Sequence, residues 1–128
     1  MKYIPWRVAW EVLFHSDFDA EFDELSEVVQ DELLAHTKLL GQFGPQLGRP
    51  RVDTLKGSHH ANMKQLRFDA DNGVWRVAFA FDPKRCAVLL VAGDKSGGSE
   101  KKFYRQLIIK GDGRFDDHLV SVKKKARK

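Results

Sequence analysis

The chain has 128 residues, of which 42% are hydrophobic and 31% are charged, and it carries a formal net charge of +4. This composition predicts a globular protein with an apolar core and excludes fibrous and intrinsically disordered chains. Its single cysteine, Cys86, excludes an internal disulfide framework and a cysteine-rich zinc site. No apolar run approaches the roughly 20 residues that cross a bilayer, so we expect a cytoplasmic protein that does not associate with membranes.

The N-terminal third predicts a short strand followed by helix. Residues 10–15 suit the strand, and Ser16 or Asp17 suits the N-cap of an acidic helical segment. From residue 18 to residue 40, apolar side chains recur every three or four positions. This spacing predicts helix with one buried face, and we expect a break near Ser26.

Turn-forming residues end this helical segment. Gly41 and the Gly44-Pro45 pair are expected to stop the helix, and the loop at 47–51 leads towards a sheet. For Trp6 and Trp10, two interpretations stay open: the N-terminal segment covers the edge of the sheet, or it contacts a partner.

The middle of the chain predicts three antiparallel strands, joined by turns at residues 71–73 and 82–85. Strict alternation of apolar and polar residues supports the first two strands. A nearly continuous apolar run suits a central third strand that is buried on both faces. The predicted strands span residues 62–69, 74–82 and 87–92.

A final helix is predicted from Glu100 to about Ile109, with Phe103 and Leu107 facing inward. The end of the chain is basic, and we expect a flexible tail from about residue 118. Residues 1–128 are thus expected to form one α+β domain. In it, an N-terminal strand and helices pack on a twisted antiparallel sheet, and a helix follows at the C-terminus.

Two arginines are predicted to lie side by side on the sheet. In the predicted strands at 62–69 and 74–82, the apolar residues mark the core face. Alternation therefore places Arg67 and Arg76 together on the other face. The small Ala78 and Ala80 suggest that this face is concave and uncrowded. Adjacent guanidinium groups repel one another unless an anion lies between them.

The anion between the two arginines has two possible sources. One is a bound phosphate, which a guanidinium fork matches well. The other is an acid of the chain itself, such as Asp69, Asp71 or a carboxylate of the first helices.

Charge is segregated along the chain. Residues 1–48 contain three Lys or Arg against nine Asp or Glu, a net charge of −6, whereas the remaining residues contain 19 against nine, a net charge of +10. A basic half of this kind attracts polyanions such as nucleic acids. A well-solvated surface is the simpler alternative.

Four short segments stand out by their order and spacing: KQLR at 64–67, WRVAF at 75–79, LLVAGDKSG at 89–97 and KKFYR at 101–105. Together they resemble the RelE/ParE superfamily of toxins, and within it the HigB-like branch of phage-derived toxins. The similarity spans about residues 11–117. Each motif is weak by itself, whereas the order and spacing of the four are distinctive.

The resemblance implies a microbial-RNase-like fold, in which helices cover one face of the sheet and the other face binds RNA. It also implies the toxin of a type II toxin-antitoxin system. Such a toxin is an endoribonuclease that cuts messenger RNA, commonly on the ribosome, needs no cofactor, and is neutralised by a cognate helix-turn-helix antitoxin.

The resemblance assigns a catalytic set. Arg67 and Arg76 match basic residues of two neighbouring sheet strands, Lys95 matches the basic position that closes the next strand, and Tyr104 matches a tyrosine near the C-terminal helix. Lys95 stands where arginine is often found, and the spacing to Tyr104 is longer than the usual pattern. The implied reaction is attack of the ribose 2′-hydroxyl on the adjacent phosphorus, which requires no metal.

Proton transfer adds one candidate, His60, because imidazole titrates near neutral pH and some HigB-like toxins use a histidine in this loop. The alternative is that His59 and His60 are solvated turn residues. Metal binding by the pair is not expected, because adjacent side chains diverge and no third ligand lies at a useful spacing. Cys86 lacks a paired histidine, which favours a structural thiol over a nucleophile.

Further polar residues are candidates for RNA contacts. Three of them belong to the basic patch of the final helix, for which a solvated helix face is the alternative. The candidates are Lys56, His59, Asn62, Lys64, Lys101, Lys102 and Arg105.

Two other functions remain compatible with the sequence. The first is a ParE-like toxin that inhibits DNA gyrase without cutting nucleic acid. The second is a non-catalytic RNA-binding regulatory module that uses the same basic face.

Overall fold

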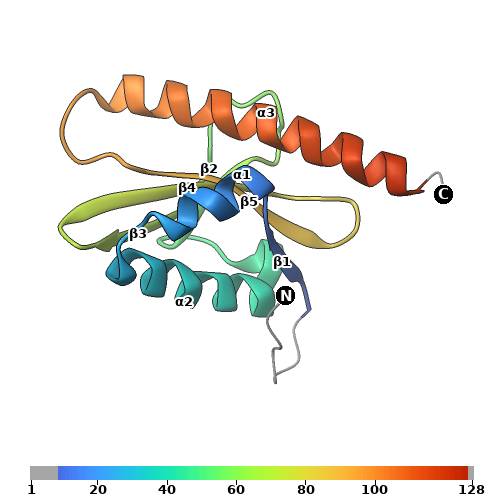
Figure 1. The fold of residues 1–128 in the computed structure, drawn as a ribbon, viewed down its shortest axis with the longest axis horizontal. Coiled ribbons are helices and arrows are strands. Elements are labelled where there is room, and N and C mark those ends of the chain that lie inside the picture. The colour runs from blue at the N-terminus through green and yellow to red at the C-terminus, as the bar shows by residue number, and fades with distance from the viewer. Residues whose placement is uncertain (1–8, 127–128) are drawn as a thin grey trace.

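The computed structural model describes residues 9–126, so Trp6 lies outside the described part of the chain. In chain order, a strand and two helices are followed by a 3-10 turn, four strands and a long helix (Figure 1). The elements are β1 (Glu11–Phe14), α1 (Ser16–Asp23), α2 (Glu27–Phe43), η1 (Gly44–Gln46), β2 (Val52–Thr54), β3 (Lys64–Ala70), β4 (Gly73–Phe81), β5 (Cys86–Asp94) and α3 (Glu100–Ala126).

The strands form a five-stranded sheet in the order β1-β5-β4-β3-β2. The predicted α+β class is confirmed, although β1 pairs with β5 in parallel and makes the sheet mixed. The three predicted central strands are present as β3, β4 and β5. The short β2 falls just after the segment interpreted as a loop, and its three residues are too few to show an alternating pattern.

Helices cover both faces of the sheet, with α1 and α2 on one side and α3 on the other (Figure 1). The core under α1 and α2 is built from Phe18, Val29, Leu33, Leu40, Val52, Leu66, Phe68, Val77, Phe79, Ala87 and Leu89. The core under α3 is built from Leu55, Met63, Ala78, Ala80, Cys86, Val88, Leu90, Val91, Leu107 and Phe115.

The prediction of an open second face is therefore wrong over most of the sheet. Ala78 and Ala80 are small because α3 packs directly on them, and both are fully buried. The helix comes so close that a Cβ added to Gly111 would lie 3.3 Å from the Cβ of Ala78. Small residues on strand and helix thus set how closely α3 approaches the sheet.

The helical segment of the N-terminal third is divided as predicted, since Ser26 caps α2 by accepting a hydrogen bond from the Val29 N–H at 3.3 Å. The predicted cap of α1 is wrong: Nδ1 of His15 accepts from the Asp17 N–H. An imidazole acceptor placed before the helix serves the same purpose as a serine oxygen.

The end of α2 lies at Gly44, whereas Gly41 is buried inside the helix. Gly44 has φ +55°, and a Cβ added there would lie 2.3 Å from Nε1 of Trp10. The Trp10 ring also contacts Phe81, with ring centroids 4.8 Å apart, and the Arg85 guanidinium carbon lies 4.5 Å from its centroid. Trp10 therefore covers the sheet where the β4–β5 turn begins.

The last helix is much longer than predicted. Gly111 and Gly113 weaken the intrinsic helix preference of this region, but Phe115 is 3% exposed and Leu119 packs on the same core. Tertiary packing thus carries the helix past both glycines to Leu119, and the helix ends at Ala126. The tail expected from about residue 118 is helical as far as this point, and its flexibility stays a prediction. Within residues 9–126, no helix combines the length and apolarity that a membrane span requires.

Arg114 joins α3 to α1. Its Nη1 and Nη2 donate to the two carboxylate oxygens of Glu21, each at 2.7 Å, and Nη1 also donates to the Leu90 carbonyl at 2.8 Å. These hydrogen bonds, followed by the charge of Arg114, hold the pKa of Glu21 below its ordinary 4.5 despite partial burial. Arg114 thereby fixes α3 to α1 through Glu21 and to β5 through the Leu90 carbonyl.

Replacing this carboxylate should destabilise the protein. We expect Glu21→Gln to lower the free energy of unfolding at pH 7 by about 1 kcal/mol, a modest value because Glu21 is partly exposed. Since the folded-state pKa of Glu21 is lowered, its contribution is complete above pH 4.5 and is lost as the pH falls through the folded-state value. Urea unfolding at pH 7 and at acid pH measures both effects, with Glu24→Gln as the exposed control. A difference between wild type and Glu21→Gln that persists at acid pH would contradict this account.

Cys86 is a buried thiol at the start of β5. It is 7% exposed, and burial, followed by the charges of Asp82 and Glu11, raises its pKa from 9.0 to about 11. The thiolate is the reactive form of cysteine. The interpretation of Cys86 as a structural thiol is consistent with this environment.

Alkylation kinetics should show this protection. At pH 8, a thiol with a pKa of about 11 instead of 9.0 holds about one hundredth of the thiolate, so iodoacetamide should label native Cys86 at least about 100-fold more slowly than the unfolded chain. Because the sequence contains one cysteine, mass spectrometry reports this site alone. Labelling at equal rates with and without urea would show that the thiol is accessible.

Candidate functional site

Arg67 and Arg76 face each other across β3 and β4, where they are directly paired in the antiparallel register. Directly opposed residues point to the same face, so the prediction that the two arginines share a face is confirmed, whereas the expectation that this face has no core is wrong. That face is the one on which α3 packs. The pair lies towards the β3–β4 hairpin, beyond the alanines that contact the helix.

Neutral groups hold Arg76 in place. Its Nε donates to the Tyr104 hydroxyl at 3.2 Å, and its Nη1 donates to the Trp75 carbonyl at 2.8 Å. The Tyr104 hydroxyl in turn donates to Oε1 of Gln65 at 3.1 Å. Arg76 is only 6% exposed, yet no carboxylate of residues 9–126 forms an ion pair with it.

Arg67 is less completely satisfied. Its Nη1 lies 3.7 Å from Oδ2 of Asp53, a weak ion pair with a partly exposed carboxylate on β2. Its Nε is buried and has no hydrogen-bond partner within the described part of the chain. The acid that pairs with Arg67 among residues 9–126 is thus not Asp69, Asp71 or an acid of the first helices, because the unpredicted strand β2 supplies it.

An open depression of about 210 Å³ lies beside the two arginines. It is lined by Pro50, Arg67, Phe68, Asp69 and Arg76. Both arginines therefore border a space that a ligand can enter from solvent.

Lys95 extends this cationic group towards α3. Its Nζ lies 5.9 Å from the centroid of the Tyr104 ring and donates to Oε1 of Glu100 at 2.6 Å. The pKa of Glu100 is lowered first by this hydrogen bond and by the charge of Lys95, and then by the charges of Arg76 and Arg67. Glu100 thus lies in the field of all three cations.

We refer to Arg67, Arg76, Lys95 and Tyr104, with Gln65 and Glu100, as the arginine site. Sequence patterns did not reveal Gln65 or Glu100, because a single buried amide and an acidic first helical residue are both common. The three cations are matched in number by three carboxylates: Asp53 and Glu100, which pair with Arg67 and Lys95, and Asp69, which lines the same depression.

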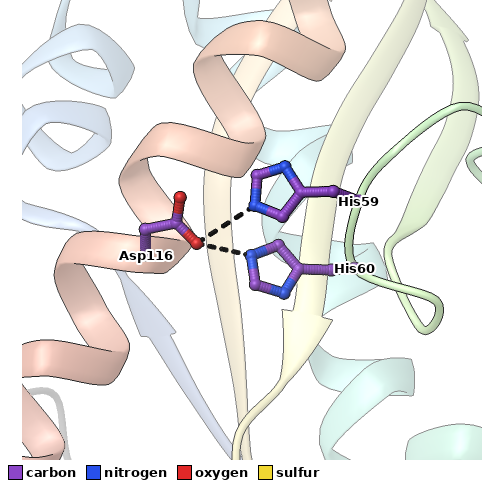
Figure 2. Close-up of side chains that lie close together, drawn as sticks. All are labelled: His59, His60 and Asp116. Atoms are coloured by element: carbon purple, nitrogen blue, oxygen red, sulfur yellow. Dashed lines mark hydrogen bonds and ion pairs between the residues drawn. The ribbon is translucent and has the colours of Figure 1, made fainter.

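His60, the fifth catalytic candidate, lies elsewhere. Its Nε2 is 2.7 Å from Oδ1 of Asp116, and Nε2 of His59 is 3.2 Å from the same oxygen (Figure 2). Asp116 follows Tyr104 by twelve residues on α3, which corresponds to about 18 Å along a helix. The structure therefore does not bring His60 together with the arginine site.

The charges around these histidines are complementary. The pKa of His59 is raised, first by its hydrogen bond to Asp116 and then by the charges of Asp112 and Asp116. The pKa of Asp116 is lowered by its hydrogen bonds to His59 and His60.

His118, which lacked any signal in the sequence, also has a carboxylate partner. Its Nε2 lies 2.7 Å from Oδ2 of the buried Asp82. Burial acts to raise the pKa of Asp82, but the hydrogen bonds from His118, Cys86 and Lys84 outweigh it and lower the pKa. A depression of about 480 Å³ lies between this pair and His60, and its lining is His60, Asn62, Phe81, Asp82, Pro83, Phe115 and Leu119.

The candidate RNA-binding residues are spread over the surface. Lys101, Lys102 and Arg105 are exposed on the first turns of α3, close in sequence to Glu100 and Tyr104. Asn62 donates to the Phe81 carbonyl at 3.4 Å, at the histidine end of the molecule. Lys56 and Lys64 lie apart from both groups. Lys56 is exposed in the loop before β3, and strand alternation turns Lys64 towards the face opposite Arg67.

Comparison with known proteins accounts for most of the chain. Residues 20–116 match the family described as "Phage derived protein Gp49-like (DUF891)". A protein named "Putative toxin HigB2" from Mycobacterium tuberculosis (strain ATCC 25618 / H37Rv) is 41% identical over 100 residues, covering 75% of this chain and 49% of the relative. A protein named "Putative toxin HigB3" from the same strain is 46% identical over 83 residues, covering 65% of this chain and 70% of the relative.

The first of these relatives is about twice as long as the segment that matches it, whereas most of the second is covered. The matched residues include the arginine site and the histidines that contact Asp116. The resemblance to the HigB-like branch that the sequence motifs indicated is confirmed, and the chain belongs to the phage-derived Gp49-like family.

Proposed function

We propose that this protein is the toxin of a type II toxin-antitoxin system and that it cleaves messenger RNA at the arginine site. The main support is the cross-strand pair Arg67 and Arg76, which borders an open depression and of which Arg76 donates to the Tyr104 hydroxyl. Membership of the Gp49-like family and the names of the two relatives agree with the proposal.

The arrangement suits the transition state of phosphodiester cleavage. Attack by the 2′-hydroxyl places additional negative charge on the oxygens of the phosphorus, and two guanidinium groups on rigid strands can donate to them. Arg76 is already oriented by Tyr104 and Trp75, and the Nε of Arg67 has hydrogen-bonding capacity that the described residues leave unused. Pre-oriented donors of this kind need little rearrangement during the reaction.

Proton transfer falls to Tyr104, which contacts Arg76, and to its neighbour Lys95. Lys95 and Tyr104 lie close together and offer an ammonium and a hydroxyl. In this proposal Lys95 leaves Glu100 when RNA binds, and the phosphate takes the place of the carboxylate. We leave His60 out of the catalytic set because its partner Asp116 lies about 18 Å along α3 from Tyr104.

The proposed substrate determines the partners and the compartment. Messenger RNA on the ribosome would place the protein in the cytoplasm, and its toxicity would require a cognate antitoxin, for which we propose a helix-turn-helix protein. Lys101, Lys102 and Arg105 would contact the RNA backbone beyond the scissile bond, because they extend the cationic surface along α3.

Conservative substitutions of the arginines test the proposal. Arg67→Lys and Arg76→Lys keep the charge but lose the fork that binds two phosphate oxygens, so we expect cleavage to fall about 10²- to 10³-fold. Mapping of new 5′ ends in transcripts after induced expression measures this, and circular dichroism verifies the fold. Lys84→Ala, an exposed change in the β4–β5 turn, is the matched control and should cleave like wild type.

Two results would contradict the proposal. If both lysine variants produced wild-type 5′ ends, the arginines would not act on the phosphate. If induction of the wild type caused DNA breaks and an SOS response without new 5′ ends, the protein would act on gyrase instead. RNA binding without cleavage would indicate a regulatory module.

The competing carboxylate provides a separate prediction. Glu100→Gln removes the negative charge next to Lys95, so we expect tighter binding of a short RNA that carries a 2′-deoxy substitution at the scissile position and cannot be cut. Fluorescence anisotropy at low and high salt measures the affinity, with the exposed Glu27→Gln on α2 as control. Weaker binding by Glu100→Gln would indicate that Glu100 itself contacts the RNA.

A further inference from the structure

A second cluster of chemically active side chains lies at the other half of α3. His59 and His60 belong to the loop between β2 and β3, and Asp116 belongs to the helix. Figure 2 shows both imidazole rings directing a nitrogen towards the Asp116 carboxylate. The arginine site uses none of these three residues.

We propose that His59, His60 and Asp116 form a binding site for a divalent metal ion of the zinc type. One donor atom from each residue can be chosen so that all lie within 4.8 Å of one another. Donor atoms around a tetrahedral zinc ion, with bonds of about 2.0–2.1 Å, lie about 3.3–3.4 Å apart. The two Nε2 atoms lie 3.2 Å and 2.7 Å from Oδ1 of Asp116, so small side-chain shifts would admit the ion.

Spacing along the sequence predicted no metal site, but the fold brings three ligands together that are not grouped in the sequence. Adjacent histidines diverge on a regular strand, but here the loop turns both rings the same way, with centroids 4.4 Å apart. The third ligand comes from a residue 56 positions after His60, which the packing of α3 brings to the loop. Such a distant ligand has no local sequence pattern.

Surrounding groups already orient His59 as a metal ligand. Oδ2 of the buried Asp112 lies 3.0 Å from Nδ1 of His59 and also accepts from the His59 N–H at 3.2 Å. A hydrogen bond from Nδ1–H to a carboxylate fixes the tautomer that leaves Nε2 free to bind a metal. Asp112 is itself held by the Ser58 hydroxyl.

His60 is fixed by different contacts. Its ring packs edge-on against Phe115, with centroids 4.9 Å apart. The backbone N–H of His60 donates to the Ser58 hydroxyl at 2.9 Å. Its side chain is 17% exposed. The loop therefore presents both rings in a defined position before any ion binds.

The donor set selects the class of ion. Two imidazole nitrogens and one carboxylate oxygen suit zinc, cobalt, nickel and copper, whereas magnesium and calcium prefer oxygen ligands. The side chains of His59 and Asp116 are 60% and 51% exposed, so water can complete the coordination. Binding would connect the loop to α3 without involving the arginine site.

Titration of the untagged, chelator-treated full-length chain tests the site. We expect one zinc ion per chain by calorimetry, a visible cobalt spectrum of tetrahedral type, and a rise in Tm with zinc but not with magnesium. His59→Ala and Asp116→Asn should each weaken zinc binding by more than tenfold, and Asp112→Asn should weaken it about 10- to 100-fold through the orientation of His59.

His15→Asn serves as the matched control, because it removes an imidazole elsewhere while keeping an acceptor for the cap of α1. Circular dichroism without metal separates loss of ligand from loss of fold, and the exposed His59 is not expected to affect folding. The proposal fails if wild type binds no zinc, or if folded His59→Ala and Asp116→Asn bind zinc as wild type does. It also fails if His15→Asn removes the binding.

Discussion

The arginine site and the proposed metal site both depend on how closely α3 approaches the sheet. The buried alanines of β4 and the buried Gly111 of the helix allow their backbones to come close together, and Arg114 ties the same helix to α1. This single packing arrangement brings Tyr104 to Arg76 at one end of α3 and brings Asp112 and Asp116 to the histidines at the other. Larger side chains at the contact would move the helix outward and separate both groups.

The arginine site is characterised by limited neutralisation. Two opposed guanidinium groups on a sheet are unfavourable unless compensated, yet Arg76 is supported by dipoles of Tyr104 and Trp75, and Arg67 by one distant carboxylate. Tighter carboxylate pairs would stabilise the fold more but would compete with a phosphate. The arrangement is therefore compatible with the anionic ligand that we propose for this site.

Local patterns predicted a large part of the fold. Alternation located β3 and β4 and placed Arg67 beside Arg76, because one face of each strand had to be apolar. The same reasoning could not detect that α3 covers the second face, since Ala78 and Ala80 suit either an open surface or a tightly packed helix. It likewise missed β2, and it ended α3 too early, because burial of Phe115 outweighs two unfavourable glycines. The partners of the histidines are distant in sequence, so no spacing rule could identify Asp112 or Asp116.

The length of α3 has a mechanical consequence. A continuous helix of 27 residues transmits a displacement at one end to the other, since its hydrogen bonds resist axial compression. A slide of one helical turn, about 5.4 Å, would separate Tyr104 from Arg76 and Asp116 from His60 together. A contact that holds the histidine loop against one end of α3 would therefore also restrain Tyr104 at the opposite end.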